Sequence, residues 1–205
     1  MDIKDYFLRD VASHTMEVVR VDGVHRHLRF RRGGESYING FDVITWPGTL
    51  CIQGDCGTYV FSRLTDMFQF FRSPDGRINP SYWQEKVEAQ DRTGGIKEWD
   101  ERSFRQNVVQ RFRDWWRESY EFGARRKCWQ ELRTQVLECS ESEYEAMPAA
   151  YAFEFSDDGI SPTFRLEDAY ELAGERYTRR FLWNCHAIVW AIQQFDASNY
   201  SNEAA

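Results

Sequence analysis

Two histidines and two cysteines in the first third of the chain are residue types from which a zinc site can be built. His25 and His27 stand two positions apart, so both imidazoles would project from one face of an extended strand. Cys51 and Cys56 follow, and thiolate and imidazole are the ligands of structural Zn²⁺ sites. A Cys-x4-Cys pair across a tight turn, however, matches no known zinc ribbon or knuckle. The pattern favours an exposed polar strand face, and neither a metal nor another cofactor is expected.

Cys56 is the candidate nucleophile, because it lies in a glycine-flanked turn, Gly54-Asp55-Cys56-Gly57. An adjacent carboxylate raises the pKa of a thiol and so lowers the fraction of reactive thiolate. The sequence has no glycine-rich phosphate loop, no Gly-x-Ser-x-Gly elbow and no His-Glu-x-x-His motif. The turn is predicted to be a hairpin. Motifs give catalysis no support, although a catalytic site assembled from scattered residues stays open.

Charged residues are distributed unevenly in the second half of the chain. Nine basic residues stand against four acidic ones between residues 102 and 133, whereas eleven acidic residues stand against one arginine between residues 138 and 175. An acidic surface attracts cationic partners, among them the grooves with which proteins bind nucleic acid. The acids expected to form such a partner-binding surface are Glu138, Glu141, Glu143, Glu145, Asp157, Asp158, Glu167 and Asp168. The alternative is that the two segments neutralise each other within the fold.

A smaller basic face is the second candidate binding surface. The strand expected over residues 24–32 turns Arg26, Leu28 and Phe30 toward one side. Its other side carries His25, His27, Arg29 and Arg31. Direct binding of nucleic acid is disfavoured, because the formal net charge is -7 and the arginine-rich segments carry interleaved acids.

Turn signals divide the first third of the chain into short strands. Asp22-Gly23 is a strong hairpin signal, and glycine-containing turns also follow residues 32, 46 and 53. The strands expected between the turns span residues 17–21, 24–32, 37–46, 50–53 and 58–62. Connections this short cannot make parallel crossovers, so an antiparallel meander is predicted.

Helical periodicity marks most of the remaining chain. Helices are expected over residues 2–12, near 64–71, from Pro80 toward Gly94-Gly95, from 104 to Gly123, from 124 to 139 and from 177 to 195. The last is apolar over most of its circumference, which is typical of a helix enclosed by other elements. We therefore expect an α+β fold, with an N-terminal antiparallel meander of about five strands packed against a mostly helical C-terminal part and a central buried C-terminal helix.

The chain is expected to form a single domain, residues 1–205, whose sheet-containing and helical halves would be residues 1–93 and 96–205. The tail after Asp196 is expected to fray. No apolar run is long enough for a membrane span, and the first ten residues do not have the pattern of a secretion signal. Five cysteines, an odd number without framework spacing, favour reduced thiols in a cytoplasm.

Three stretches between His25 and Arg72 carry a family pattern: HRHLRFRR, FDVITWPGTLCIQGDCGTYVFSR and DMFQFFR. They resemble a family of uncharacterised accessory proteins encoded by bacteriophages and prophages. The resemblance covers about a quarter of the chain closely and implies a protein that acts in the cytoplasm of an infected bacterial host. Small, acidic, aromatic-rich phage proteins without enzyme motifs are often inhibitors of host defence, including anti-CRISPR proteins.

The function expected from these observations is that of a non-enzymatic phage protein. It would bind and inhibit a host or defence protein with a basic nucleic-acid-binding surface, through its own acidic, aromatic-bearing surface. One alternative is a small phage enzyme or nucleotide-binding protein with a scattered site. A second is a DNA-associated phage factor that uses the arginine-rich strand. No membrane partner is expected, and the sequence leaves the oligomeric state open.

Overall fold

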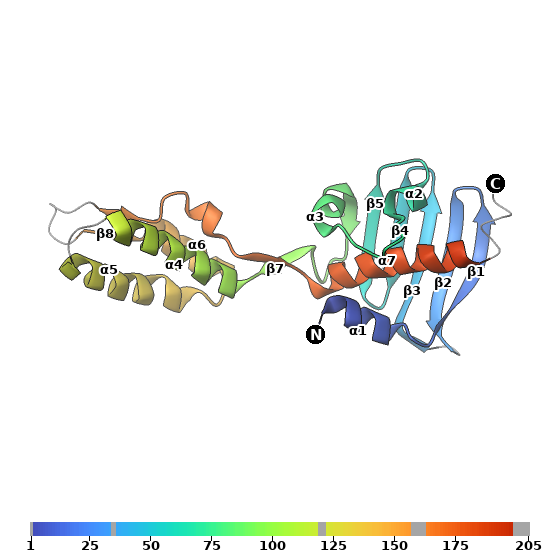
Figure 1. Ribbon diagram of the computed structural model, residues 1–205, viewed down its shortest axis with the longest axis horizontal. Helices are drawn as coiled ribbons and strands as arrows, with labels where there is room; N and C mark the ends of the chain where they lie inside the picture. The colour runs from blue at the N-terminus through green and yellow to red at the C-terminus, as the bar shows by residue number, and fades with distance from the viewer. Residues whose placement is uncertain (1, 34–35, 119–121, 157–162, 199–205) are drawn as a thin grey trace. The chain divides into compact units, whose positions relative to one another are not determined.

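The chain folds into two compact units in a computed structural model that describes residues 2–33, 36–118, 122–156 and 163–198 (Figure 1). The sheet unit consists of residues 1–96 and 177–205, and the helical unit of residues 97–176. An antiparallel sheet and a separate helical region confirm the predicted α+β class. The last helix returns to the sheet unit, so the helical part ends at residue 176 and not at residue 205.

Six strands form one antiparallel sheet in the order β1-β2-β3-β4-β5-β6, so the predicted meander is confirmed. Its strands are β1 (His14–Asp22), β2 (His25–Arg32), β3 (Ser36–Trp46), β4 (Thr49–Gly54), β5 (Gly57–Ser62) and β6 (Val87–Gln90). Gly23 and Gly48 occupy hairpin turns with φ of 56° and 82°. Glycine adopts such positive φ without the steric cost that a Cβ adds, which explains the turn signals at these positions.

The sixth strand corrects a predicted helix. The helix expected from Pro80 toward Gly94-Gly95 ends at Trp83 as α3 (Pro80–Trp83), and after a 3-10 turn, η1 (Gln84–Lys86), the chain enters β6. In β6, Ala89 pairs with Val60 of β5. A four-residue edge strand is too short to show a period of its own, and pairing satisfies the free backbone groups of β5.

The core of the sheet unit lies between one face of the sheet and α7 (Arg179–Ala197), beside which α1 (Ile3–Asp10) and α2 (Met67–Phe71) pack (Figure 1). Buried side chains of this core include Leu28, Phe30, Phe41, Val43, Ile52, Phe181, Ile188 and Ile192. Trp183 of α7 is also buried, and its indole N–H donates to Asp10 at 3.0 Å. The predicted burial of the C-terminal helix is confirmed.

The helical unit contains α4 (Glu101–Glu118), α5 (Phe122–Gln135), α6 (Glu143–Ala152), and the 3-10 turns η2 (Leu137–Cys139) and η3 (Ala169–Leu172). Two short ladders accompany them: β7 (Lys97–Trp99) pairs with β10 (Glu175–Tyr177), and β8 (Glu154–Phe155) pairs with β9 (Phe164–Arg165). Its core includes Phe104, Val108, Leu132, Ala146 and Leu172. Gly123 was expected to end a helix but lies in the first turn of α5, where glycine is also tolerated.

In the described part of the chain, no helix has the length and apolarity needed to cross a membrane.

Replacing Gly54 by alanine is expected to lower the free energy of unfolding by about 1–3 kcal/mol, the usual cost of overpacking. Gly54 pairs with Phe41 at the end of β4, and a Cβ there would overlap the carbonyl oxygen of Gly40. Gly33→Ala is the matched control, because a Cβ at residue 33 meets nothing within 4 Å. Guanidinium unfolding followed by circular dichroism measures both, and equal midpoints for the two variants would contradict the close approach.

Candidate functional site

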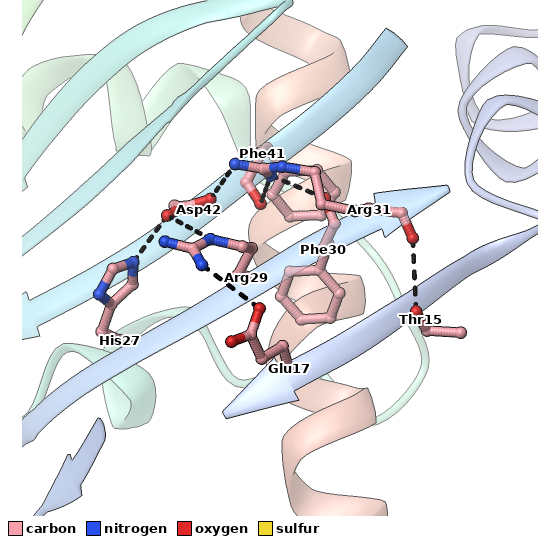
Figure 2. Close-up of polar contacts among 8 residues, drawn as sticks. All are labelled: Thr15, Glu17, His27, Arg29, Phe30, Arg31, Phe41 and Asp42. Carbon is pink, nitrogen blue, oxygen red and sulfur yellow. Dashed lines mark hydrogen bonds and ion pairs between the residues drawn. The ribbon is translucent and has the colours of Figure 1, made fainter. Parts of the chain in front are cut away.

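The basic face of the sheet carries the first set of predicted binding residues. Along β2, Arg26, Leu28 and Phe30 are buried, and the residues between them are partly or fully exposed, so the predicted alternation is confirmed. The outward side chains are His25, His27, Arg29 and Arg31. Figure 2 shows three of them, His27, Arg29 and Arg31, converging on Asp42 of the neighbouring strand β3.

Asp42 is the centre of this arrangement and only 6% of its side chain is exposed. One of its oxygens, Oδ2, lies 2.6 Å from Nε2 of His27 and 3.5 Å from Nε of Arg29. The other, Oδ1, accepts a 2.6 Å hydrogen bond from Nη2 of Arg31. Arg31 also donates through Nη1 to the backbone carbonyls of Phe30 and Phe41, at 2.8 Å each. Its guanidinium is therefore committed to the protein.

The charges of the basic face cancel. Arg29 reaches Glu17 of β1 at 3.3 Å as well as Asp42, so two carboxylates stand against the two arginines Arg29 and Arg31 (Figure 2). A surface that binds phosphates needs cations that are free of such partners. Arg29 and Arg31 thus form ion pairs within the sheet and are not free to bind phosphates. The geometry of the basic face gives little support to a DNA-associated function.

The geometry of the described residues gives neither a metal site at Cys51 and Cys56 nor a reactive thiolate at either of them. His27 is held by Asp42, and within the described ranges no group of three or more His, Cys, Asp or Glu residues could hold a metal ion. Burial, followed by the charges of Asp55 and Asp10, raises the pKa of Cys56 to about 11. Its Sγ donates to Oδ1 of Asn39 at 3.9 Å. Cys56 is therefore a protonated thiol at neutral pH.

The predicted acidic residues gather on neighbouring elements of the helical unit. Glu138 lies on η2, Glu143 and Glu145 lie in the first turn of α6, and α6 packs against both η2 and η3. Glu167 and Asp168 directly precede η3. All of these side chains, and that of Glu141, are exposed. Asp157 and Asp158 lie outside the described residues.

Part of the acidic segment is neutralised by the protein itself. Ion pairs join Arg133 to Glu138 at 3.7 Å, Arg111 to Glu171 at 2.7 Å, Arg165 to Glu154 at 2.6 Å, and Lys97 to Glu175 at 2.9 Å. Of the described acids between residues 138 and 175, five make no ion pair: Glu141, Glu143, Glu145, Glu167 and Asp168. The self-neutralisation alternative therefore holds for Glu138 but not for these five.

Exposed tyrosines accompany the unpaired acids, and sequence reasoning missed them. Tyr144 is 88% exposed, and Tyr151 and Tyr170 are each 61% exposed. Tyr144, Pro148 and Tyr151 stand at i, i+4 and i+7 of α6 and so share one side of the helix. That spacing, with a proline on the same side, is the sequence pattern that could have indicated an exposed tyrosine face. The acidic tyrosine surface is defined as Glu141, Glu143, Tyr144, Glu145, Tyr151, Glu167, Asp168 and Tyr170.

Local helix chemistry explains only part of this surface. Glu143 and Glu145 lie in the first turn of α6, where the helix dipole stabilises carboxylates, and Ser142 caps the helix by accepting from the N–H of Glu145. Tyrosines pointing into water have no such local role, because an exposed aromatic ring gains nothing from the hydrophobic effect. The three tyrosines are therefore the part of the surface that suggests a partner.

Comparison with known proteins assigns no role to either surface. No family model matches the chain, and neither a curated protein nor a solved structure matches it. The choice between the basic face and the acidic tyrosine surface therefore depends on their geometry and charge.

Proposed function

We propose that this chain is a non-enzymatic binding protein whose acidic tyrosine surface occupies a cationic surface of another protein. The observation that carries the proposal is the combination of five acids that make no ion pair with a described residue and three exposed tyrosines. Tyrosine is enriched among the residues that dominate binding energy, and unpaired charges steer association. Binding would not have to break an internal ion pair at these five acids.

Charge decides between the two candidate surfaces. On the basic face, Glu17 and Asp42 already cancel Arg29 and Arg31. On the acidic tyrosine surface, five exposed acids make no ion pair with a described residue, although the charge of Arg165 acts on Glu167. Carboxylates within about 8–10 Å of one another act together at physiological salt, because that is the Debye length. The acidic tyrosine surface is thus the one that a charged partner would meet.

The partner class follows from this chemistry and from the family resemblance. A protein that binds nucleic acid displays a cationic groove, and an acidic surface with aromatic rings offers such a groove both charge and stacking contacts. The resemblance to phage and prophage proteins supports a host or defence protein as the owner of that groove. We propose that the chain acts inside an infected bacterium by occupying the groove and so excluding nucleic acid.

A double charge reversal tests the proposal. Glu141 and Glu167 are suitable sites, because neither lies in the first turn of α6, so replacing both by lysine leaves the helix dipole interaction intact. The tagged chain is used to capture a partner from host lysate, and calorimetry then measures the affinity of that purified partner. We expect Glu141→Lys/Glu167→Lys to weaken binding at least tenfold, and Tyr144→Ser to weaken it by a similar factor.

The matched control is Glu88→Lys, which reverses an exposed acid on β6 of the sheet unit and should leave the affinity unchanged. Native binding should also weaken steeply as salt is raised. Equal affinities for the control and the double variant, or an affinity insensitive to salt, would contradict the proposal.

A further inference from the structure

A cavity of 180 Å³ in the sheet unit lies between α1, α7 and the loop that follows α2. Lys4 and Phe7 line it from α1, and His186, Trp190 and Gln193 line it from α7. It belongs to neither surface described above. Phe7 of α1 packs edge-on against Trp190 of α7 with ring centres 6.1 Å apart, and Gln193 of α7 donates through Nε2 to the backbone carbonyl of Ser73 in the loop at 3.0 Å.

His186 is the buried polar group that faces this cavity. The residue is 8% exposed, and its side chain makes no hydrogen bond with any described residue. Its ring stacks on Phe7, with centroids 6.0 Å apart and an interplanar angle of 22°. Burial, followed by the positive charge of Lys4, lowers the pKa of His186 from its ordinary value. Asp2 acts in the opposite direction and is outweighed, so the imidazole is neutral at pH 7.

A neutral imidazole has one N–H donor and one acceptor nitrogen, and at His186 neither is bonded to a described residue. The other charged groups that line the cavity are Lys4 and Asp75. Asp75 is already satisfied, because its carboxylate accepts from the Ser73 hydroxyl at 2.9 Å and from the backbone N–H of Arg77 at 3.2 Å. The guanidinium of Arg77 also lies 2.6 Å away from it.

Lys4 differs from Asp75 in this respect. It is exposed and makes no ion pair with any described residue. The polar groups of the cavity that lack a protein partner are therefore an ammonium, which only donates, and a neutral imidazole, which can donate. Both suit a ligand atom that accepts hydrogen bonds and carries negative charge.

The rest of the lining is apolar and sets the size of a ligand. Phe7, Leu8, Pro74, Val189 and Trp190 supply the hydrophobic walls. Liquid water occupies about 30 Å³ per molecule, so the cavity has room for roughly six waters or for one small organic molecule. Gly76 lines the cavity with a φ of 69°, a backbone conformation that glycine adopts without the strain of a larger residue.

We propose that this cavity binds a small monocarboxylate with a flat apolar body. The carboxylate would lie between Lys4 and His186, and the apolar body would fill the space lined by Phe7, Val189 and Trp190. The site is independent of the acidic tyrosine surface, and neither proposal needs the other.

Benzoate is the probe, titrated into the full chain while NMR follows the imidazole signals. The chain has four histidines, so His25 on the basic face serves as an internal reference. We expect a saturable shift of the His186 signals and none of the His25 signals. Benzyl alcohol, which has the same ring without the charge, should bind at least tenfold more weakly than benzoate.

The variant Lys4→Gln should weaken benzoate at least tenfold without affecting the fold, because Lys4 is exposed. Arg63→Gln is the matched control, since it removes an exposed positive charge that does not line the cavity. Unshifted His186 signals at tens of millimolar benzoate, or equal benzoate affinities for the two variants, would overturn the proposal. If inorganic phosphate displaced benzoate at a concentration below that of benzoate itself, the cavity would prefer an anion without an apolar body, and the proposed ligand class would be wrong.

Discussion

The variant Asp42→Ala should lower the free energy of unfolding by about 2–4 kcal/mol. Removing one member of a fully buried ion pair costs about 3–5 kcal/mol, because the remaining charge keeps its desolvation penalty. Asp42 is 6% exposed, but Arg31 and Arg29 are 22% and 37% exposed. Water partly solvates these two arginines when the carboxylate is lost, which moderates the cost. Guanidinium unfolding followed by far-ultraviolet circular dichroism measures the change.

Two controls separate the charge of Asp42 from its hydrogen bonding. Asp42→Asn keeps an acceptor for Arg31 but not the negative charge, so its effect should be intermediate. Glu17→Ala removes the exposed partner of Arg29 and should change stability by less than about 1 kcal/mol, as exposed ion pairs do. If Asp42→Ala were no more destabilising than Glu17→Ala, Asp42 could not be the centre that holds the basic face.

The sequence predicted which side chains of β2 face outward but not what holds them. Alternation needs only the two-residue period of a strand, and that period is visible in residues 24–32. The pairing of Arg29 with Asp42 depends on the register of β2 against β3, and this register shifts between Phe30 and Arg32. A bulge adds an unpaired residue without a clear sequence mark. The sequence of the turn between β2 and β3 therefore could not predict that Arg29 and Arg31 pair with carboxylates.

The acidic segment shows the same limit at longer range. Its charge was apparent from composition, but which acids are paired depends on the packing of distant elements, as for Arg111 and Glu171, which are 60 positions apart in the sequence. Only Arg165 lies within the segment, and it pairs with Glu154 across the short β8–β9 ladder. The sequence shows that residues 144 and 151 are tyrosines, but their exposure depends on which side of α6 faces the core.

The return of α7 to the sheet unit is a third case. Its apolar circumference correctly predicted burial, because a helix of that kind must be enclosed. The pattern does not say by what, and the chain places α7 against strands that precede it by more than a hundred residues. Adjacency in sequence therefore suggested a helical half that included α7, whereas hydrophobic contact with the sheet decides its position.

The variant Asp66→Ala should be the most destabilising of those considered, by about 3–5 kcal/mol. Arg26, on the packed face of β2, is 9% exposed and donates to both carboxylate oxygens of Asp66, at 2.7 and 3.2 Å. Its guanidinium also lies 4.5 Å from the ring centre of Phe68. Asp66 in addition caps α2 by accepting from the N–H of Phe68 at 3.0 Å. Alanine at residue 66 leaves a buried cation unpaired and a helix uncapped.

The effect of Asp66→Ala should depend on pH. Burial alone would raise the pKa of Asp66, but hydrogen bonds from Arg26 and the Phe68 N–H, with the charge of Arg26, outweigh it and hold the pKa below the ordinary 3.8. In acid the unfolded chain takes up this proton first, so the stabilisation is complete above about pH 5 and is lost as pH falls through the folded pKa. The difference between native chain and variant should therefore shrink at the acid end of a pH series of unfolding measurements.

A double variant identifies the buried charge as the cause. Arg26→Met/Asp66→Asn removes both charges, fills the volume of the arginine stem with an apolar side chain and keeps a capping residue at the start of α2. Replacing a whole buried ion pair by apolar groups is often neutral, whereas breaking it is costly. The double variant should thus be more stable than Asp66→Ala alone. If both were equally unstable, the unpaired charge of Arg26 could not be the main cause of the loss in Asp66→Ala.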